Sequence, residues 1–167
     1  MRTAESESAC VSAVRATPER LLQSFGVVGG RELQGKPGLY QVDTVLEKPT
    51  PTVAEQRAIV PGLRSGHYLA FFGMHVLAPS VLDAIGKMLH DSPDARVNLS
   101  DALAAIASQE KYLALQVSAE RYDLGARYGL LTSQLALALA STDRDEVLSM
   151  LVTMLANEQQ YAQEAAR

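Results

Sequence analysis

The sequence predicts an α/β protein in which a mixed sheet is flanked by helices. Short apolar runs typical of strands alternate with segments of helical apolar spacing, and helices accumulate towards the carboxyl end. The chain has 167 residues, of which 47% are hydrophobic and 20% charged, and this is a globular composition. We therefore expect a single domain over residues 1–167.

The predicted strands are runs rich in β-branched and aromatic residues that lie between turn signals. They cover residues 10–15, 25–28, 39–46, 67–77 and 113–117. The turn signal at residues 35–38 predicts a hairpin between the second and third strands. The fourth run is almost continuously apolar, which is typical of a central strand buried on both faces.

The predicted helices show apolar residues at helical spacing after a capping residue or a proline. They cover residues 18–23, 53–57, 79–89, 100–106 and 128–140, and a last helix starts near residue 142. Thr17 is the predicted cap of the first of these helices, and Ser100 that of the fourth.

Composition excludes several classes of function. The formal charge of −4 argues against a general nucleic-acid binder, and no basic run is interleaved with aromatic residues. Cys10 is the only cysteine, which excludes an intrachain disulfide framework and a cysteine-rich zinc site and fits a cytoplasmic location. No apolar run approaches the roughly 20 residues that span a bilayer, so we expect no membrane association.

The stretch Val42–Pro49 carries the clearest chemical signal. Its apolar residues suit a strand that stops before Pro49, and the proline favours an extended conformation at Lys48. Glu47 and Lys48 are then presented at the carboxyl end of a strand, where ligands of open α/β sheets usually bind. Lys48 could pair with a phosphate, and Glu47 could accept hydrogen bonds from ligand hydroxyl groups. Alternatively, both side chains could be solvated charges.

Other polar and glycine positions have a structural interpretation as well as a functional one. Gly26 and its neighbours at 29 and 30 predict either a β-bulge or a close approach of the backbone to a ligand. His67 and His75 lie on one predicted strand without an acidic residue or cysteine to complete a metal site, so we expect hydrogen-bonded histidines. Asp123 precedes an apolar helix, and an N-cap is the structural interpretation.

Five landmarks in register resemble a known family over residues 9–140. They are Phe25-Gly26-Val27-Val28, Val45-Leu46-Glu47-Lys48-Pro49, Tyr68 to Pro79, Asn98 to Leu103, and Arg121-Tyr122-Asp123-Leu124-Gly125 followed by Tyr128-Gly129-Leu130. Together they resemble the carboxyl-terminal half of a bacterial sugar-phosphate nucleotidyltransferase, most of all a UTP–glucose-1-phosphate uridylyltransferase, also called UDP-glucose pyrophosphorylase. Residues 141–167 form a carboxyl-terminal helix beyond the resemblance.

The resemblance implies part of a Rossmann-like fold and the chemistry of nucleotide-sugar synthesis from UTP and glucose 1-phosphate, with magnesium. By position, Lys48 would hold the sugar phosphate, Glu47 would contact the sugar hydroxyls, and Gly26 would let the backbone approach the sugar. Asp123 would be one of two carboxylates on the metal. Such transfers depend on placement and charge neutralisation rather than on a covalent nucleophile.

Two features of the family lie outside the part of it that this chain resembles. The family's glycine-rich nucleotide loop and its second metal-binding aspartate lie upstream of the matched stretch, so we expect a sugar-phosphate-binding portion that is incomplete for catalysis alone. The alternative is a non-catalytic module that binds a sugar phosphate or nucleotide sugar, or mediates assembly. Because part of a sheet exposes an edge and an apolar face, we expect a homo-oligomer, in particular a twofold dimer.

Overall fold

The computed structural model describes residues 1–94 and 96–165, and it divides the chain into two compact units, residues 1–119 and 120–167. The first unit contains α1 (Arg2–Glu7), β1 (Cys10–Pro18), η1 (Glu19–Ser24), β2 (Val27–Glu32), β3 (Leu39–Leu46), α2 (Pro51–Arg57), β4 (His67–Val76), α3 (Pro79–Asp91), α4 (Leu99–Gln109) and β5 (Tyr112–Gln116). The second unit contains α5 (Gly129–Leu139) and α6 (Arg144–Ala165). Compact units can belong to one domain, so the single domain over residues 1–167 stays a prediction.

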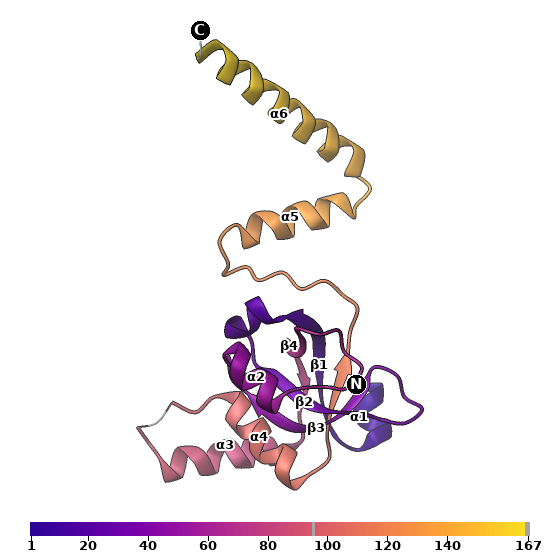
Figure 1. The fold of residues 1–167 in the computed structure, drawn as a ribbon, viewed down its shortest axis with the longest axis vertical. Coiled ribbons are helices and arrows are strands. Elements are labelled where there is room, and N and C mark those ends of the chain that lie inside the picture. The colour runs from indigo at the N-terminus through magenta and orange to yellow at the C-terminus, as the bar shows by residue number, and fades with distance from the viewer. Residues whose placement is uncertain (95, 166–167) are drawn as a thin grey trace. The chain divides into compact units, whose positions relative to one another are not determined.

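The strands of the first unit close into a barrel in the order β1-β4-β2-β3-β5 (Figure 1). Strand β5 completes the ring because it runs parallel to β1 and antiparallel to β3. The other pairs are antiparallel, so the predicted mixed sheet with flanking helices is confirmed. The sequence does not predict the closure, since it depends on a pairing between the first and last strands.

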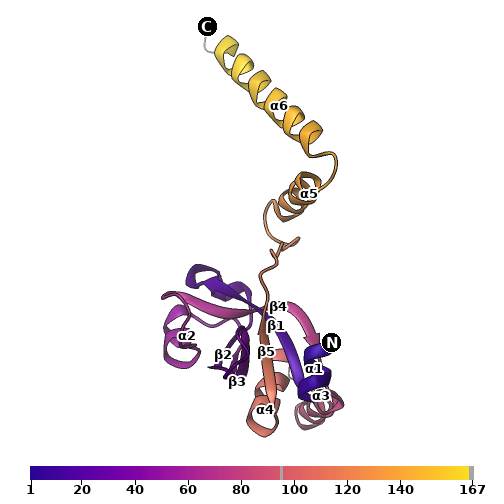
Figure 2. The ribbon, with the colours of Figure 1, turned by 90° about the vertical axis from the view of Figure 1, so that its right-hand side faces the viewer.

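Helices cover both faces of the strands, and Figure 2 shows α2 and α3 on opposite sides of them. Alternate side chains point to opposite faces of a strand. In β4, Leu69 and Phe71 belong to the core beneath α3 and α4, whereas Tyr68 and Ala70 belong to the core beneath α2 and η1. These four residues are buried, so the prediction of two buried faces is confirmed for residues 68–71. It is wrong for the second half of the strand, where Met74 is 58% exposed and no residue from 72 to 76 is buried.

The hairpin of β2 and β3 has the predicted turn and an irregular register. Val27 pairs with Leu46 and Val28 with Val45, but the register shifts between Gly29 and Gly30. This is the predicted β-bulge. A Cβ atom at Gly30 would lie 2.0 Å from the carbonyl oxygen of Gln41, so the bulge itself requires glycine. These two glycines are therefore explained without a ligand.

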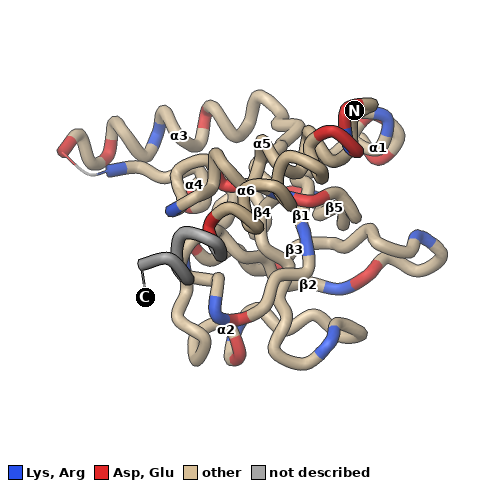
Figure 3. Tube along the Cα trace, turned by 90° about the horizontal axis from the view of Figure 1, so that it is seen from above, with Lys and Arg blue, Asp and Glu red and all other residues tan. Residues whose placement is uncertain are grey.

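Charged residues are spread over the whole chain rather than gathered on one element. Figure 3 shows Lys and Arg positions scattered singly and interspersed with acidic ones. In α3, for example, Asp83, Lys87 and Asp91 alternate along one helix. No helix in the described residues is long and apolar enough to cross a membrane.

Candidate functional site

Glu47 and Lys48 follow β3 directly, as the sequence predicts, because the strand ends at Leu46. The expected extended conformation of Lys48 is wrong: its φ is 45°, in the left-handed region. The Lys48 amide donates to the carbonyl oxygen of Phe25 at 3.2 Å, and this contact holds the turn against the chain that enters β2. A non-glycine residue in this region is strained by roughly 1–2 kcal/mol. Local strain of this kind is often found at functional sites.

Gly26 lies beside this turn, between Phe25 and the start of β2. Its carbonyl oxygen accepts a hydrogen bond of 2.8 Å from the Phe71 amide of β4. A Cβ atom at this position would lie 2.6 Å from Cδ2 of Phe71 and 3.1 Å from the Ser100 hydroxyl. Gly26 is therefore required by close packing against a ring and a helix terminus.

Ser100 is a residue of this site that the sequence does not single out as functional. Its hydroxyl donates to Glu47 Oε2 at 2.5 Å, and its side chain is buried. The prediction that Ser100 caps α4 is wrong, because Asn98 is the N-cap and forms a capping box with Asp101. Since the cap is supplied by Asn98, the Ser100 hydroxyl is available to bind Glu47.

The site combines one acidic and one basic side chain that both reach solvent. Lys48 Nζ lies 3.8 Å from Glu47 Oε1, and the two side chains are 59% and 34% exposed. An ion pair this exposed contributes at most about 1 kcal/mol to stability, so the ammonium group can exchange partners at little cost. The structure thus brings Gly26, Glu47 and Lys48 together as a small polar site with Ser100 at its base.

Asp123 belongs to the second unit, where it shapes a turn. Its Oδ1 accepts a hydrogen bond of 2.9 Å from the Gly125 amide, and its carbonyl oxygen accepts one of 3.2 Å from the amide of Ala126. The N-cap interpretation is wrong, because the N-cap of α5 is Tyr128. A Cβ atom at Gly129 would lie only 1.9 Å from the Asp123 carbonyl oxygen, so this turn is tightly closed.

A magnesium site is not complete in the part of the chain that the structure describes. Among the side chains that the structure describes, no three of His, Cys, Asp or Glu gather as a possible metal site. Magnesium is usually held by one or two carboxylates together with substrate phosphates. Asp123 alone does not fit this requirement, and its role as a metal ligand stays a prediction.

The two histidines of β4 are hydrogen-bonded, as expected. His75 Nδ1 lies 2.6 Å from the hydroxyl of Ser12, and that hydroxyl lies 2.6 Å from the hydroxyl of Tyr112. Burial lowers the pKa of His75 and raises that of Tyr112, so both side chains are neutral at pH 7. His67 Nδ1 lies 3.2 Å from the carbonyl oxygen of Ser65. Both histidines therefore have a structural role.

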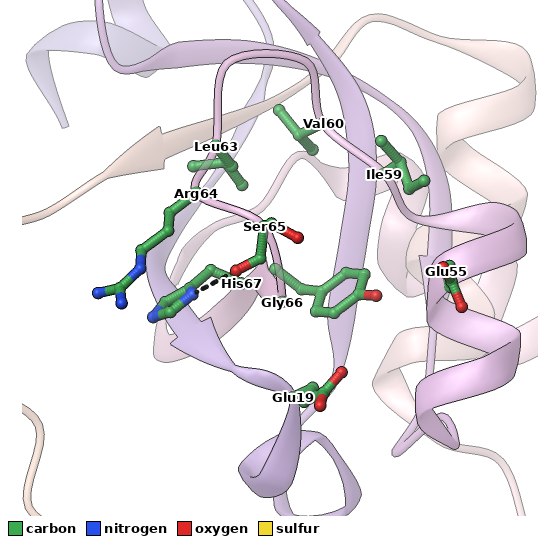
Figure 4. A pocket seen from close by; sticks show the side chains of 10 residues that line it. Glu19, Glu55, Ile59, Val60, Leu63, Arg64, Ser65, Gly66 and His67 are labelled. Carbon is green, nitrogen blue, oxygen red and sulfur yellow. Dashed lines mark hydrogen bonds between the residues drawn. The ribbon is translucent and has the colours of Figure 1, made fainter.

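A cavity of about 430 Å³ lies between η1, α2 and the loop that precedes β4, and His67 contributes to its lining (Figure 4). Its lining is polar and of mixed charge, with Glu19 and Glu55 across from Arg64 and His67. Burial raises the pKa of the lining residue Tyr68, and the two carboxylates raise it further. None of Gly26, Glu47 and Lys48 lines this cavity, so the residues that the sequence singles out form a separate site.

Comparison with known proteins gives a consistent resemblance. No protein-family profile matches the chain. A UTP–glucose-1-phosphate uridylyltransferase of Streptococcus pneumoniae is 25% identical over 151 residues, which are 90% of this chain and 46% of that protein. One from Streptococcus pyogenes is 28% identical over 145 residues, which are 86% of this chain and 43% of that protein. The chain thus spans less than half the length of these curated relatives.

Solved structures show the same fold. A UDP-glucose pyrophosphorylase in complex with UDP-glucose superposes with a TM-score of 0.64 at 18% identity, over 84% of this chain and 48% of that chain. A UTP-bound UGPase from Acinetobacter baumannii gives 0.63 at 20% identity, over 91% of this chain and 47% of that chain. The chain therefore resembles part of the UDP-glucose pyrophosphorylases in sequence and has part of their fold, which confirms the resemblance predicted above.

Proposed function

We propose that this chain is the sugar-phosphate-binding portion of a nucleotidyltransferase that makes a nucleotide sugar of the UDP-glucose type from UTP and glucose 1-phosphate. The observation that carries this proposal is the gathering of Gly26, Glu47 and Lys48 in one polar site. The three residues come from two strand ends, and the hydrogen bond from the Lys48 amide to Phe25 joins those ends. This bond continues the antiparallel register in which Val27 pairs with Leu46, and it sets Lys48 beside the chain that carries Gly26.

Each residue of the site has a role that its chemistry supports. The Lys48 ammonium group is exposed and can pair with the phosphate of the sugar. Glu47 is an acceptor for sugar hydroxyl groups, and its side chain also reaches solvent. At Gly26 a sugar ring could approach the backbone only from the side that Phe71 and Ser100 leave open, because an added Cβ atom would lie 2.6 Å from the Phe71 ring. Glucose 1-phosphate and UDP-glucose both offer a phosphate beside a ring of hydroxyl groups.

The proposed reaction requires placement and charge neutralisation. An oxygen of the sugar phosphate attacks the α-phosphorus of UTP, and the bond from that phosphorus to the departing pyrophosphate breaks. Lys48 would hold the attacking phosphate and neutralise part of the negative charge near the reacting centre. A second chain or segment would have to hold the triphosphate, so the portion described here would be incomplete for catalysis alone.

Magnesium belongs to the proposal only once a nucleotide site is completed. The ion would supply further charge neutralisation at the phosphates. Asp123 is the residue of this chain that we propose as a ligand, because it lies in the matched Arg121–Gly125 segment. One of its oxygens is engaged by the Gly125 amide, and this contact would orient the carboxylate.

Assembly without catalysis is a second candidate function, favoured by the character of α5. Its sequence, GLLTSQLALAL, is apolar around most of the helix, and such a helix is normally buried. Leu130, Leu131 and Leu137 are more than half exposed. We therefore propose a homo-oligomer, specifically a twofold dimer. A monomeric mass in light scattering at micromolar concentration would contradict it.

We also propose the cytoplasm as the location, because the single cysteine, Cys10, is a free thiol.

Calorimetric titration of the purified protein tests the proposed function. Glucose 1-phosphate and UDP-glucose are added with and without magnesium, to the wild type and to Lys48→Ala and Asp123→Ala. Loss of a charged hydrogen-bonding group costs about 1.5–3 kcal/mol, so Lys48→Ala should weaken binding by about one to two orders of magnitude. Lys87→Ala, at an exposed position of α3, is the control and should bind as the wild type does.

The alternative outcomes separate the two candidates. If folded wild type gives no heat with either ligand, the sugar-phosphate function is wrong and assembly becomes the better account. If binding occurs but is unchanged in Lys48→Ala, the ligand lies elsewhere and the site is misassigned. If wild-type binding depends on magnesium, loss of that dependence in Asp123→Ala would support the carboxylate as a metal ligand, and an unchanged dependence would refute that role.

A further inference from the structure

The contact between Ser100 and Glu47 assigns a role to a residue outside the predicted site. Ser100 is 7% exposed, and its hydroxyl donates to Glu47 Oε2 at 2.5 Å. Hydrogen bonds from a hydroxyl to a carboxylate are short and about twice as strong as bonds between neutral groups. The partner carboxylate is 34% exposed, so a buried donor holds a group that solvent and a ligand can reach.

The position of the Ser100 hydroxyl is set by a rigid part of the fold. Ser100 is the second residue of α4, and the capping box of Asn98 and Asp101 fixes the helix terminus. One turn later, Leu103 is fully buried in the core. Glu47, in contrast, follows the last residue of β3 and lies outside regular secondary structure. The helix therefore supplies the fixed end of this hydrogen bond, and the carboxylate is the end that it orients.

The orientation distinguishes the two oxygens of Glu47. Oε2 is engaged by Ser100, and Oε1 is the oxygen 3.8 Å from Lys48 Nζ. Each carboxylate oxygen has two lone-pair sites, so acceptor capacity remains for ligand hydroxyl groups. We propose that Ser100 is the positioning residue of Glu47. It holds the carboxylate in the orientation that accepts hydrogen bonds from sugar hydroxyl groups, without touching the ligand itself. This inference rests on the proposed function for its ligand.

The chain contains a matched control for this contact. Ser80 is the second residue of α3, and its hydroxyl donates to Glu110 Oε2 at 3.0 Å. The pair has the same chemistry and the same helix position, but neither residue belongs to the candidate site. The Ser80 bond is exposed, whereas Ser100 is buried. An effect that comes only from losing a serine hydroxyl at a helix start would therefore also appear in Ser80→Ala, and Ser100→Thr controls for the buried position.

Binding measurements give the first test. Glucose 1-phosphate and inorganic phosphate are titrated into wild type, Ser100→Ala, Ser100→Thr and Ser80→Ala. We expect Ser100→Ala to bind glucose 1-phosphate about tenfold more weakly, because a Glu47 carboxylate that is no longer held in place makes weaker hydrogen bonds to the sugar hydroxyl groups. Binding of inorganic phosphate, which has no sugar hydroxyl groups, should be unchanged. Ser100→Thr should restore the affinity, and Ser80→Ala should match the wild type. Equal weakening for both ligands, or no weakening at all, would overturn the inference.

The orientation of Glu47 gives a second test that needs no ligand. Side-chain couplings of Glu47, measured by NMR, should report one rotamer in wild type and Ser100→Thr and averaging in Ser100→Ala. An unchanged rotamer in Ser100→Ala would overturn the positioning role whatever the binding data show. If wild type binds no glucose 1-phosphate but the averaging appears, the positioning role is supported and the proposed function fails, so the two failures are distinguishable.

Discussion

The two units of the chain differ in how their apolar residues are used. The first unit buries residues from every strand, and Leu69, Leu103 and Leu113 have no exposed surface. In the second unit, Ser133 is the only buried residue among the described side chains, while Leu137 is 72% exposed. The first unit therefore contains its own core, and the second is a pair of helices whose apolar side chains require another surface.

This difference indicates where function can be specified by this chain alone. A polar site needs side chains held by packed elements, and Glu47 is held by Ser100 of α4. In the second unit, Asp123 is held by local contacts with Gly125 and Ala126. Local contacts orient a carboxylate but do not bring it to other groups. The sugar-phosphate side of the proposed site is thus built within the first unit, and the metal side is not.

Truncation of one leucine in each unit tests the comparison most directly. Leu103→Ala should lower the free energy of unfolding by about 2–5 kcal/mol, because a fully buried leucine is lost from the core. At protein concentrations low enough to keep the chain monomeric, Leu137→Ala should change it by no more than about 0.5 kcal/mol, because that side chain is largely exposed in the single chain. Urea unfolding followed by circular dichroism measures both values.

Protein concentration is the control in this experiment. If Leu137→Ala is as destabilising as Leu103→Ala, and only at high concentration, the apolar face of α5 is buried by self-association in solution. That outcome would break the comparison between the units and would support the proposed dimer. Equal losses at every concentration would instead place Leu137 in a core within one chain.

Most elements of the first unit could be predicted because their signals are local. The apolar runs and the turn at residues 35–38 predict β3 and β4 almost to their ends, and the glycines at 29 and 30 predict the bulge. Closure of the sheet could not be predicted, since Cys10 pairs with Tyr112, about a hundred residues away. No local pattern records which strands meet over that separation.

The candidate site divides in the same way. Glu47 and Lys48 could be identified from the strand and proline that surround them. The role of Ser100 could not, because its partner is 53 residues away and its position in a helix start makes a cap the simpler interpretation. The φ of Lys48 could not be predicted either: Pro49 favours an extended conformation at the residue before it, and no local pattern indicates the observed left-handed value of 45°.

Two glycines of the first unit, Gly26 and Gly86, can be compared by adding a methyl group at each. In Gly26→Ala the added carbon would lie 2.6 Å from the Phe71 ring, so we expect a loss of about 1–3 kcal/mol in unfolding free energy. Gly86, in α3, has no atom within 4 Å of an added carbon, and Gly86→Ala should stabilise the helix by up to about 1 kcal/mol. Thermal unfolding compares the two. A Gly26→Ala protein as stable as the wild type would show that the site is looser than its contacts imply.

The smallest predicted effect concerns α1, which Glu7 ties to the first unit. Hydrogen bonds from Lys111 at 2.8 Å and from Lys36 lower the pKa of Glu7 from 4.5 to about 2. A carboxylate whose pKa is lowered by folding adds stability that is complete above its unfolded pKa and is lost as the pH falls through the folded value. The stability that depends on Glu7 should therefore disappear between about pH 4.5 and pH 2.

Urea midpoints at pH 7, 4.5 and 3 measure this effect in wild type and in Glu7→Gln. The variant should be less stable than wild type at pH 7, and the difference should shrink as the pH falls from 4.5 towards 2, because the unfolded chain then takes up a proton at Glu7 that the folded protein does not. Glu5→Gln, on the same helix, should parallel the wild type at every pH. If the urea midpoints of Glu7→Gln and wild type differ by a constant amount over this pH range, the two lysines do not hold α1 through the charge of Glu7. The contacts of Ala4 with the apolar cluster of Val11, Leu39 and Leu113 would then be what anchors α1.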